Sequence, residues 1–254
     1  MTPPDQIPID IVLLDIEGTT TPVAFVHDTL FSYVRDRLHE WMVRHADSPA
    51  LRGIEAQLAA EHRKEAADIT LPGWPADGGD VHGPAEAYAR WLMARDRKSP
   101  GLKELQGLIW EQGYQAGDLR GIVYDDVPPA LRRWHRMGLG VAIYSSGSEL
   151  AQRRLFESTL HGDLTPLITA FFDTRVGAKV EATSYRRIAE ALGCRAGRML
   201  FVSDVTPELE AASAAGCVTR LIERPGNAVQ PGASRFPVVA SFDDVLPEHP
   251  GAAR

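Results

Sequence analysis

The chain has 254 residues, of which 44% are hydrophobic and 24% are charged, and this composition argues against a fibrous protein and against extended disorder. Its length predicts one large domain, or a domain that carries a big insertion. The net charge of −7, from 27 Lys and Arg against 34 Asp and Glu, argues against nucleic acid or an anionic membrane as a partner.

The first ten residues lack the basic and apolar stretches of a secretory signal, and no apolar run approaches the ~20 residues that span a bilayer. Two cysteines, Cys194 and Cys217, are too few for a disulfide framework or a four-sulfur zinc site. These features predict a cytoplasmic protein in a reducing environment. We expect a monomer.

Short apolar runs rich in β-forming residues recur along the chain, and such runs are typical of strands covered on both faces of a parallel sheet. The runs are Ile9–Leu14, Leu139–Tyr144, Thr169–Phe172, Met199–Val202 and Val218–Ile222, with a weaker one at Pro237–Ala240. Helical spacing appears between the later runs, as in Tyr185–Leu192, which Gly193 is placed to end. Strands that alternate with helices predict an α/β fold with an open parallel sheet.

Residues 25–120 interrupt this alternation, because apolar stripes at helical spacing predict four helices there. Within that block, Asp68–Ala85 has three prolines and four glycines and is predicted to be a loop. We interpret residues 25–120 as an inserted helical cap domain, and residues 1–24 with 121–254 as the catalytic core. The alternative is that these helices pack on the same sheet.

Oxygen-bearing side chains follow each of the first four predicted strands, at the sheet edge where open α/β proteins bind their ligands. They are Asp15, Glu17, Ser145, Ser146, Asp173 and Asp204. Asp15 and Glu17 are spaced so that both can approach one ligand, and two acids that close favour a shared cation or proton. Gly18 allows a sharp backbone turn after them. The plainer interpretation is a strand end with solvated acids.

The serines, the lysine and the last acid each have a plain explanation as well. Ser145 and Ser146 lie before a predicted helix, where hydroxyls and amides can hold a phosphate, but Ser148 can simply cap that helix. Lys179 precedes another helix, where a cation opposes the helix dipole unless an anion is near, although it can also be an ordinary surface lysine. Asp204 can be a helix cap.

Taken together, these motifs resemble a known family. An acid pair in DIEGT, a serine after the second strand, Lys179 and the SD pair at Asp204 resemble the haloacid dehalogenase (HAD-like) superfamily of aspartate-dependent phosphatases. DIEGTTTP, FVHD, DVPPAL, IYSSGS, LFVSDVTPELEAA and RPGN resemble the enolase-phosphatase E1 family of methionine salvage. The resemblance runs from about Ile11 to Asn227 and implies a Rossmann-like three-layer core with an all-helical cap after the first strand.

The resemblance implies a role for each matching residue. Asp15 is the expected nucleophile, which forms an aspartyl-phosphate, and Glu17 is the expected general acid and then base. One Mg²⁺ ion is expected on Asp15, on Asp204 and on the backbone carbonyl or side chain of Glu17. Lys179 is a further expected catalytic residue, and it is expected to bind the phosphoryl oxygens together with Ser145 and Ser146.

The family's reaction is the implied activity. A phosphorylated diketone, 2,3-diketo-5-methylthio-1-phosphopentane, is enolised and dephosphorylated to 1,2-dihydroxy-3-keto-5-methylthiopentene (acireductone) and phosphate. The base for enolisation cannot be identified from the residues, and Glu17 is our first choice for it. Arg95, Lys98 and Lys103 of the cap either contact substrate or form a solvated charged face.

Two other functions fit parts of the pattern. A HAD-like phosphatase for another small phosphoester has the same residues at its strand ends. A non-enzymatic receiver-like phospho-aspartate switch also combines acids, a hydroxyl and a lysine around Mg²⁺. Its order along the chain differs, however, and it has no inserted block of about a hundred residues after the first strand.

Overall fold

The computed structural model describes residues 8–65, 67–75, 81–97 and 99–247, so Lys98 lies outside the described residues. The chain forms two compact units. One contains the residues up to Val26 and those from Arg120 onward, and the other is His27–Leu119. Within the described ranges, no helix is both long and apolar enough to cross a bilayer. Both cysteines lie in these ranges, and neither is in a disulfide.

The first unit is built on a six-stranded parallel sheet in the order β3-β2-β1-β4-β5-β6. The strands are β1 (Ile11–Leu14), β2 (Gly140–Tyr144), β3 (Ala170–Phe172), β4 (Met199–Ser203), β5 (Val218–Ile222) and β6 (Val238–Val239). The six apolar runs of the sequence therefore all form strands, with small differences at their ends. The predicted α/β fold with a parallel sheet is confirmed.

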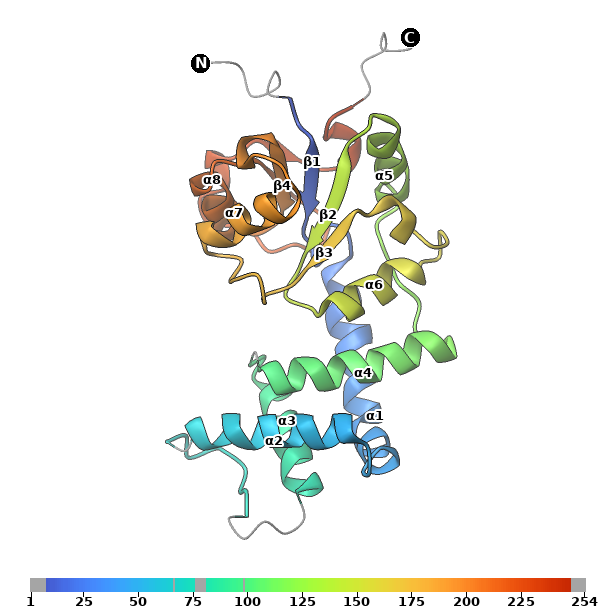
Figure 1. The fold of residues 1–254 in the computed structure, drawn as a ribbon, viewed down its shortest axis with the longest axis vertical. Helices are drawn as coiled ribbons and strands as arrows, with labels where there is room; N and C mark the ends of the chain where they lie inside the picture. Colours follow the sequence, from blue (N-terminus) through green and yellow to red (C-terminus); the bar gives the residue numbers. More distant parts are fainter. Residues whose placement is uncertain (1–7, 66, 76–80, 98, 248–254) are drawn as a thin grey trace. The chain divides into compact units, whose positions relative to one another are not determined.

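Helices cover both faces of this sheet, as Figure 1 shows, with α5 and α6 on one side and α7 and α8 on the other. Their bounds are α5 (Val127–Arg136), α6 (Glu149–Glu157), α7 (Ala182–Ala191) and α8 (Thr206–Ala214). Because the sheet is sandwiched, neither face of its central strand meets water, and Val12, Leu13 and Leu14 of β1 are fully buried. This explains why the strand sequences are continuously apolar rather than alternating.

The second unit is a bundle of helices that follows a π-helix at Phe25–Leu30. The helices are α1 (Phe31–Arg44), α2 (Pro49–Lys64), α3 (His82–Ala94) and α4 (Pro100–Ala116). Helices α1 and α2 each pack on both α3 and α4. The hydroxyls of Ser48 and Ser99 cap α2 and α4, each just before a proline at the start of its helix.

The predicted end of the Asp68–Ala85 loop was wrong, because α3 already begins at His82. Pro84 lies in the first turn of this helix, where the missing amide hydrogen breaks no intrahelical bond. The glycines and prolines of this segment therefore placed the predicted end of the loop inside the first turn of α3. Residues 76–80 of the predicted loop lie outside the described ranges.

A buried ion pair connects three segments of the first unit. The Arg224 guanidinium, only 7% exposed, donates to both carboxylate oxygens of Asp126 at 2.6 and 3.0 Å and to the Thr19 carbonyl at 3.2 Å. Asp126 also accepts from the Phe242 amide at 2.7 Å. The pair thus ties the loop after β1, the start of α5 and the C-terminal segment together. Beside it, the Tyr124 amide donates to the Thr20 carbonyl at 3.0 Å.

This ion pair makes stability depend on pH. Although burial would raise the pKa of Asp126, hydrogen bonds from Arg224 and its neighbours hold that pKa below its ordinary value of 3.8. A carboxyl with a lowered folded-state pKa contributes stability that is present above its unfolded pKa and is lost as pH falls through the folded pKa.

We expect Asp126→Asn to lower the free energy of unfolding by about 2–4 kcal/mol at pH 7, because it leaves the Arg224 charge buried without its partner. This deficit should begin to shrink as the pH falls below about 4, where Asp126 takes up a proton in the unfolded chain, and should disappear as the pH falls through the lower folded-state pKa. Urea unfolding between pH 7 and pH 3 measures it. The neighbouring Asp125→Asn is the matched control, since its side chain is fully exposed. A deficit that stays constant across this range would contradict the assignment.

Candidate active site

The carboxyl ends of β1, β2 and β4 meet at one edge of the sheet because the strands are parallel and in register. Leu14, the last residue of β1, pairs with Ile143 of β2 and with Val202 of β4. Asp15 comes next, and its amide continues the ladder by donating to the Val202 carbonyl at 3.1 Å. The register therefore brings the residues after these strands, including Ser145 and Asp204, to the same edge.

Asp15 is held in a buried charged cluster. The Lys179 ammonium lies 2.7 Å from Asp15 Oδ1 and 2.6 Å from Glu208 Oε2. The Ile16 amide also donates to Asp15 Oδ1, at 2.7 Å. Burial alone would lower the pKa of Lys179, but the two carboxylates more than offset this and raise it above its ordinary value. Lys179 is therefore a fixed cation beside Asp15, and its interpretation as an ordinary surface lysine was wrong.

Glu208 of α8 completes this cluster. It lies in the first turn of α8, where an acid is also favoured by the helix dipole, so its position alone was ambiguous. In the structure it accepts from the Ser203 hydroxyl at 3.1 Å as well as from Lys179. Burial and the negative charge of Asp15 raise its pKa. Glu210, by contrast, is exposed and forms an ion pair with Arg235.

Asp204 lies directly against the turn that follows Asp15. Burial, and then the charge of Asp15, raise the pKa of Asp204 to about 7. Its Oδ1 atom is buried and has no hydrogen-bond partner among the described residues. Gly18, at φ 67°, lets the backbone pass this close, because a Cβ there would lie 2.3 Å from Asp204 Oδ2. Asp204 is therefore no mere helix cap, since the N-cap position of α8 is occupied by Val205.

The remaining predicted site residues, Glu17, Ser145 and Ser146, follow β1 and β2 at the same edge of the sheet. Glu17 is half-buried, pairs through its backbone with Thr21, and its charge contributes to the raised pKa of Asp204. The Ser145 hydroxyl is buried and accepts from the Gly147 amide at 3.3 Å. Ser146 is exposed. Ser148 does cap α6, as the plainer interpretation had it.

Two other polar residues from the sequence analysis have structural roles. Asp173, which follows β3, binds the amide and the side chain of Arg175 at 2.8 and 3.0 Å, so it fixes a turn. Arg95 stacks over the Trp91 ring at 4.5 Å and donates to Thr70, both within the helical unit. Lys103 lies half-buried on α4.

The donor set fits a magnesium ion. The described ranges contain no group of three or more His, Cys, Asp or Glu side chains arranged around a metal position. Mg²⁺ does not require such a group, because it keeps several waters and binds through one or two carboxylates. Asp15 and Asp204 supply two carboxylates, and Asp204 Oδ1 is buried without a partner among the residues described. One lysine against several acids also leaves excess negative charge, which a divalent cation would balance.

Comparison with known proteins agrees with this geometry. Residues 9–216 match a hydrolase family described as haloacid dehalogenase-like hydrolases. The chain belongs to this family. It is 46% identical to the enolase-phosphatase E1 of Synechococcus elongatus over 95% of this chain and 100% of that protein. It is 41% identical to the enolase-phosphatase E1 of Drosophila grimshawi over 93% of this chain and 96% of that one.

Solved structures share the fold of this chain. The UTR4 protein of Saccharomyces cerevisiae is 33% identical, with a TM-score of 0.73, over 93% of this chain and all of that one. A dehalogenase structure, 19% identical at a TM-score of 0.51, shares the fold alone. Within the haloacid dehalogenase-like hydrolases, the chain is therefore an enolase-phosphatase E1 family member, and the family prediction is confirmed.

We expect Gly18→Ala to lower the free energy of unfolding by about 1–3 kcal/mol, because the new methyl group needs a left-handed backbone and meets the Asp204 carboxylate. The matched control is Gly53→Ala on α2, where a Cβ meets no atom within 4 Å. That change should instead stabilise the protein by roughly 0.5–1 kcal/mol. Urea unfolding of both variants checks the pair, and equal stability of Gly18→Ala and wild type would refute the close approach.

Proposed function

We propose that this chain converts 2,3-diketo-5-methylthio-1-phosphopentane to acireductone and phosphate, as an enolase-phosphatase of methionine salvage. The observation that carries the proposal is a buried carboxylate, Asp15, at the end of the central strand, held by a buried lysine in a chain of this family. Phosphoryl transfer needs positioning and charge stabilisation above all, and this cluster offers both.

Asp15 acts as the nucleophile on phosphorus, and its two oxygens are unequal. Oδ1 accepts from the Ile16 amide and from Lys179, both at 2.7 Å. Oδ2 has a longer contact, 3.4 Å, to the Ser203 hydroxyl. The less constrained oxygen retains more of its lone-pair density, so we assign the attack to Oδ2. The product of this step is an aspartyl-phosphate on Asp15, which water then hydrolyses.

Glu17 acts as the general acid for the leaving oxygen and then as the base for the attacking water. It follows Asp15 by two residues and is half-buried, so its carboxyl can reach both the site and solvent. We also assign it the removal of the substrate proton during enolisation, because its extra methylene reaches farther than an aspartate does. Lys179, Ser145 and Ser146 bind the phosphoryl oxygens, with Lys179 compensating their charge.

Asp15, Asp204 and the backbone carbonyl or side chain of Glu17 would hold one Mg²⁺ ion. When bound, this ion would offset the repulsion between the Asp15 carboxylate and an anionic substrate and would polarise the substrate carbonyl. The excess of acids over lysine in the cluster supports this assignment.

The domain roles, location and assembly are part of the same proposal. Residues 25–120 serve as a cap that excludes bulk water from the aspartyl-phosphate, and residues 1–24 with 121–254 serve as the catalytic core. The protein acts in the cytoplasm as a monomer, in keeping with its free thiols and its small-molecule substrate.

A phosphatase for another small phosphoester remains the competing function, because its strand-end residues would be the same. Turnover of the diketone phosphate and of a panel of sugar and other small phosphoesters separates the two. The proposed enzyme produces enediol absorbance together with free phosphate from the diketone phosphate and prefers it to the panel. A preference for another phosphoester, without enediol, would establish the alternative.

Asp15→Asn should reduce phosphate release from the diketone phosphate by roughly 10⁴-fold or more, since the amide is a poor nucleophile. Phosphate release is measured at saturating substrate, and circular dichroism checks that the variant is folded. Asp125→Asn, at an exposed position, is the control and should keep full activity. Substantial phosphate release by a folded Asp15→Asn variant would rule out the nucleophile.

Removal of divalent cations with EDTA should silence phosphate release, and added Mg²⁺ should restore it. Asp204→Asn should weaken Mg²⁺ binding by the free protein, as isothermal titration calorimetry measures without any substrate. The control is Glu210→Gln on the exposed side of α8, which should bind Mg²⁺ as wild type does. Activity that survives EDTA, or unchanged binding by Asp204→Asn, would contradict the metal assignment.

A further inference from the structure

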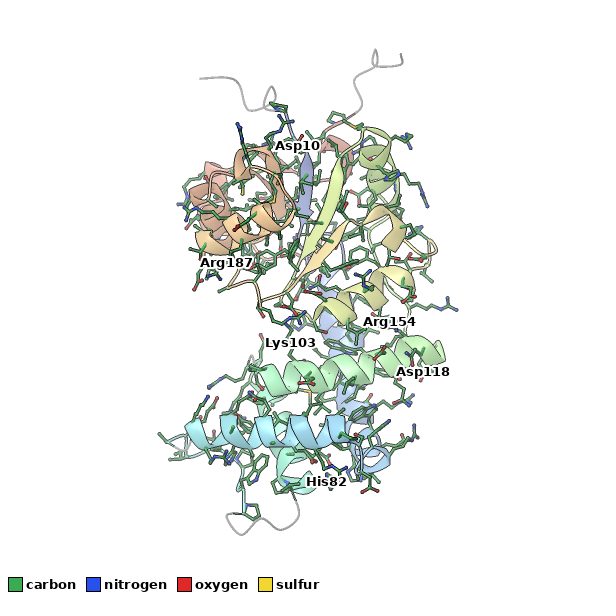
Figure 2. The ribbon with its side chains drawn as sticks, in the orientation of Figure 1. Asp10, His82, Lys103, Asp118, Arg154 and Arg187 are labelled. Atoms are coloured by element: carbon green, nitrogen blue, oxygen red, sulfur yellow. The ribbon has the colours of Figure 1, made fainter. Side chains whose placement is uncertain are left out.

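The segment that carries Lys179 is held by side-chain hydrogen bonds to its backbone carbonyls, and four carbonyls in a row each accept one. The donors come from β2 and from α7, the helix on which Arg187 is labelled in Figure 2. The pairs are Arg187 Nη1 to Val176 at 2.9 Å, Tyr144 Oη to Gly177 at 2.8 Å, Ser184 Oγ to Ala178 at 2.7 Å and Tyr185 Oη to Lys179 at 2.7 Å. Each of these bonds restrains the backbone of the irregular segment between β3 and α7.

The tyrosine that binds the Lys179 carbonyl is itself immobilised. Tyr185 is fully buried, and its ring packs edge-on against Tyr144 of β2 and Phe201 of β4, with centroids 5.6 and 5.0 Å apart. Burial raises the pKa of Tyr185, so its hydroxyl stays protonated and donates at any working pH. The hydroxyl therefore anchors the Lys179 backbone to β2 and β4, the two strands that flank β1, and Asp15 directly follows β1.

The backbone is also drawn close to the first turn of α7. Gly177 has a φ of 141°, and a Cβ there would lie 2.2 Å from Ser184 Oγ. The close approach lets the Ser184 hydroxyl reach the next carbonyl, that of Ala178. Ser184 is fully buried, so this bond is shielded from water.

We propose that Tyr185 is a positioning residue for Lys179, with Tyr144 and Ser184 supporting it. A lysine side chain has four rotatable methylenes, so its ammonium is confined only if the backbone from which it extends is fixed. Tyr185 fixes that backbone at the lysine's own carbonyl, while Asp15 and Glu208 bind the other end of the side chain. Tyr185 acts through Lys179 and does not itself contact the reacting groups.

Tyr185→Phe tests this role, because it removes the hydroxyl and keeps the ring. The first measurement is the rate at which acetic anhydride acetylates Lys179, followed by peptide mass spectrometry, and it requires no turnover. A looser Lys179 should be acetylated roughly fivefold to tenfold faster, the factor that one buried hydrogen bond represents. The kcat for phosphate release should fall by a similar factor, with KM changing less.

Tyr114→Phe is the matched control, because the Tyr114 hydroxyl is buried but has no hydrogen-bond partner in the part of the chain that is described. It should change neither acetylation nor kcat. A lower melting temperature for Tyr185→Phe, with Lys179 acetylation and kcat as in wild type, would overturn the proposal. If Tyr185→Phe does not fold, Tyr144→Phe and Ser184→Ala take its place, and unchanged acetylation in both overturns it equally.

The two measurements separate this inference from the proposed function. Only the kcat measurement rests on the proposed function, because the acetylation measurement needs no substrate. Faster acetylation in Tyr185→Phe supports the positioning role even if wild type releases phosphate from none of the phosphoesters tested. In that case the proposed function fails alone. If wild type is active and the variant is unchanged in both readouts, the positioning role fails alone.

Discussion

The contact on which the site depends is the buried Lys179 ammonium between the carboxylates of Asp15 and Glu208, at 2.7 and 2.6 Å. Burying a charge is costly unless it is paired, and here one cation faces two acids. Neighbouring groups also affect the charge balance of the cluster. The Ser203 hydroxyl donates to Glu208 and the Ile16 amide donates to Asp15, so both carboxylates are further stabilised. Asp204 adds another acid beside Asp15. A divalent cation bound at this edge would balance the surplus of negative charge.

The sheet and the family were predictable from the sequence because both depend on local patterns. A parallel sheet with helices on both faces forces its strands to be apolar throughout, and runs such as Met199–Val202 show this directly. The acid pair and Asp204 could be expected at one edge because parallel strands end together there, whereas Lys179 was expected with them only from the family resemblance. The catalytic roles of these residues, and the division into core and cap, stay predictions.

Features that depend on contacts distant in the sequence could not be predicted. Glu208 suits a first helical turn whether or not it meets Lys179. The sequence pattern predicts Tyr144 and Tyr185 to be core aromatics, and both are buried. Only the hydrogen bonds from their hydroxyls to the carbonyls of Gly177 and Lys179 show that they also hold the backbone around Lys179. An apolar pattern records burial, but it does not record where a hydroxyl points.

The bond between the Tyr124 amide and the Thr20 carbonyl has an evolutionary consequence. It lies inside the first unit and joins the segment that departs toward His27 to the segment that returns after Leu119. An insertion whose two ends emerge side by side can be lengthened, shortened or exchanged while the host fold keeps its connectivity. The sheet can thus retain one set of strand-end residues while the inserted segment changes in length and sequence.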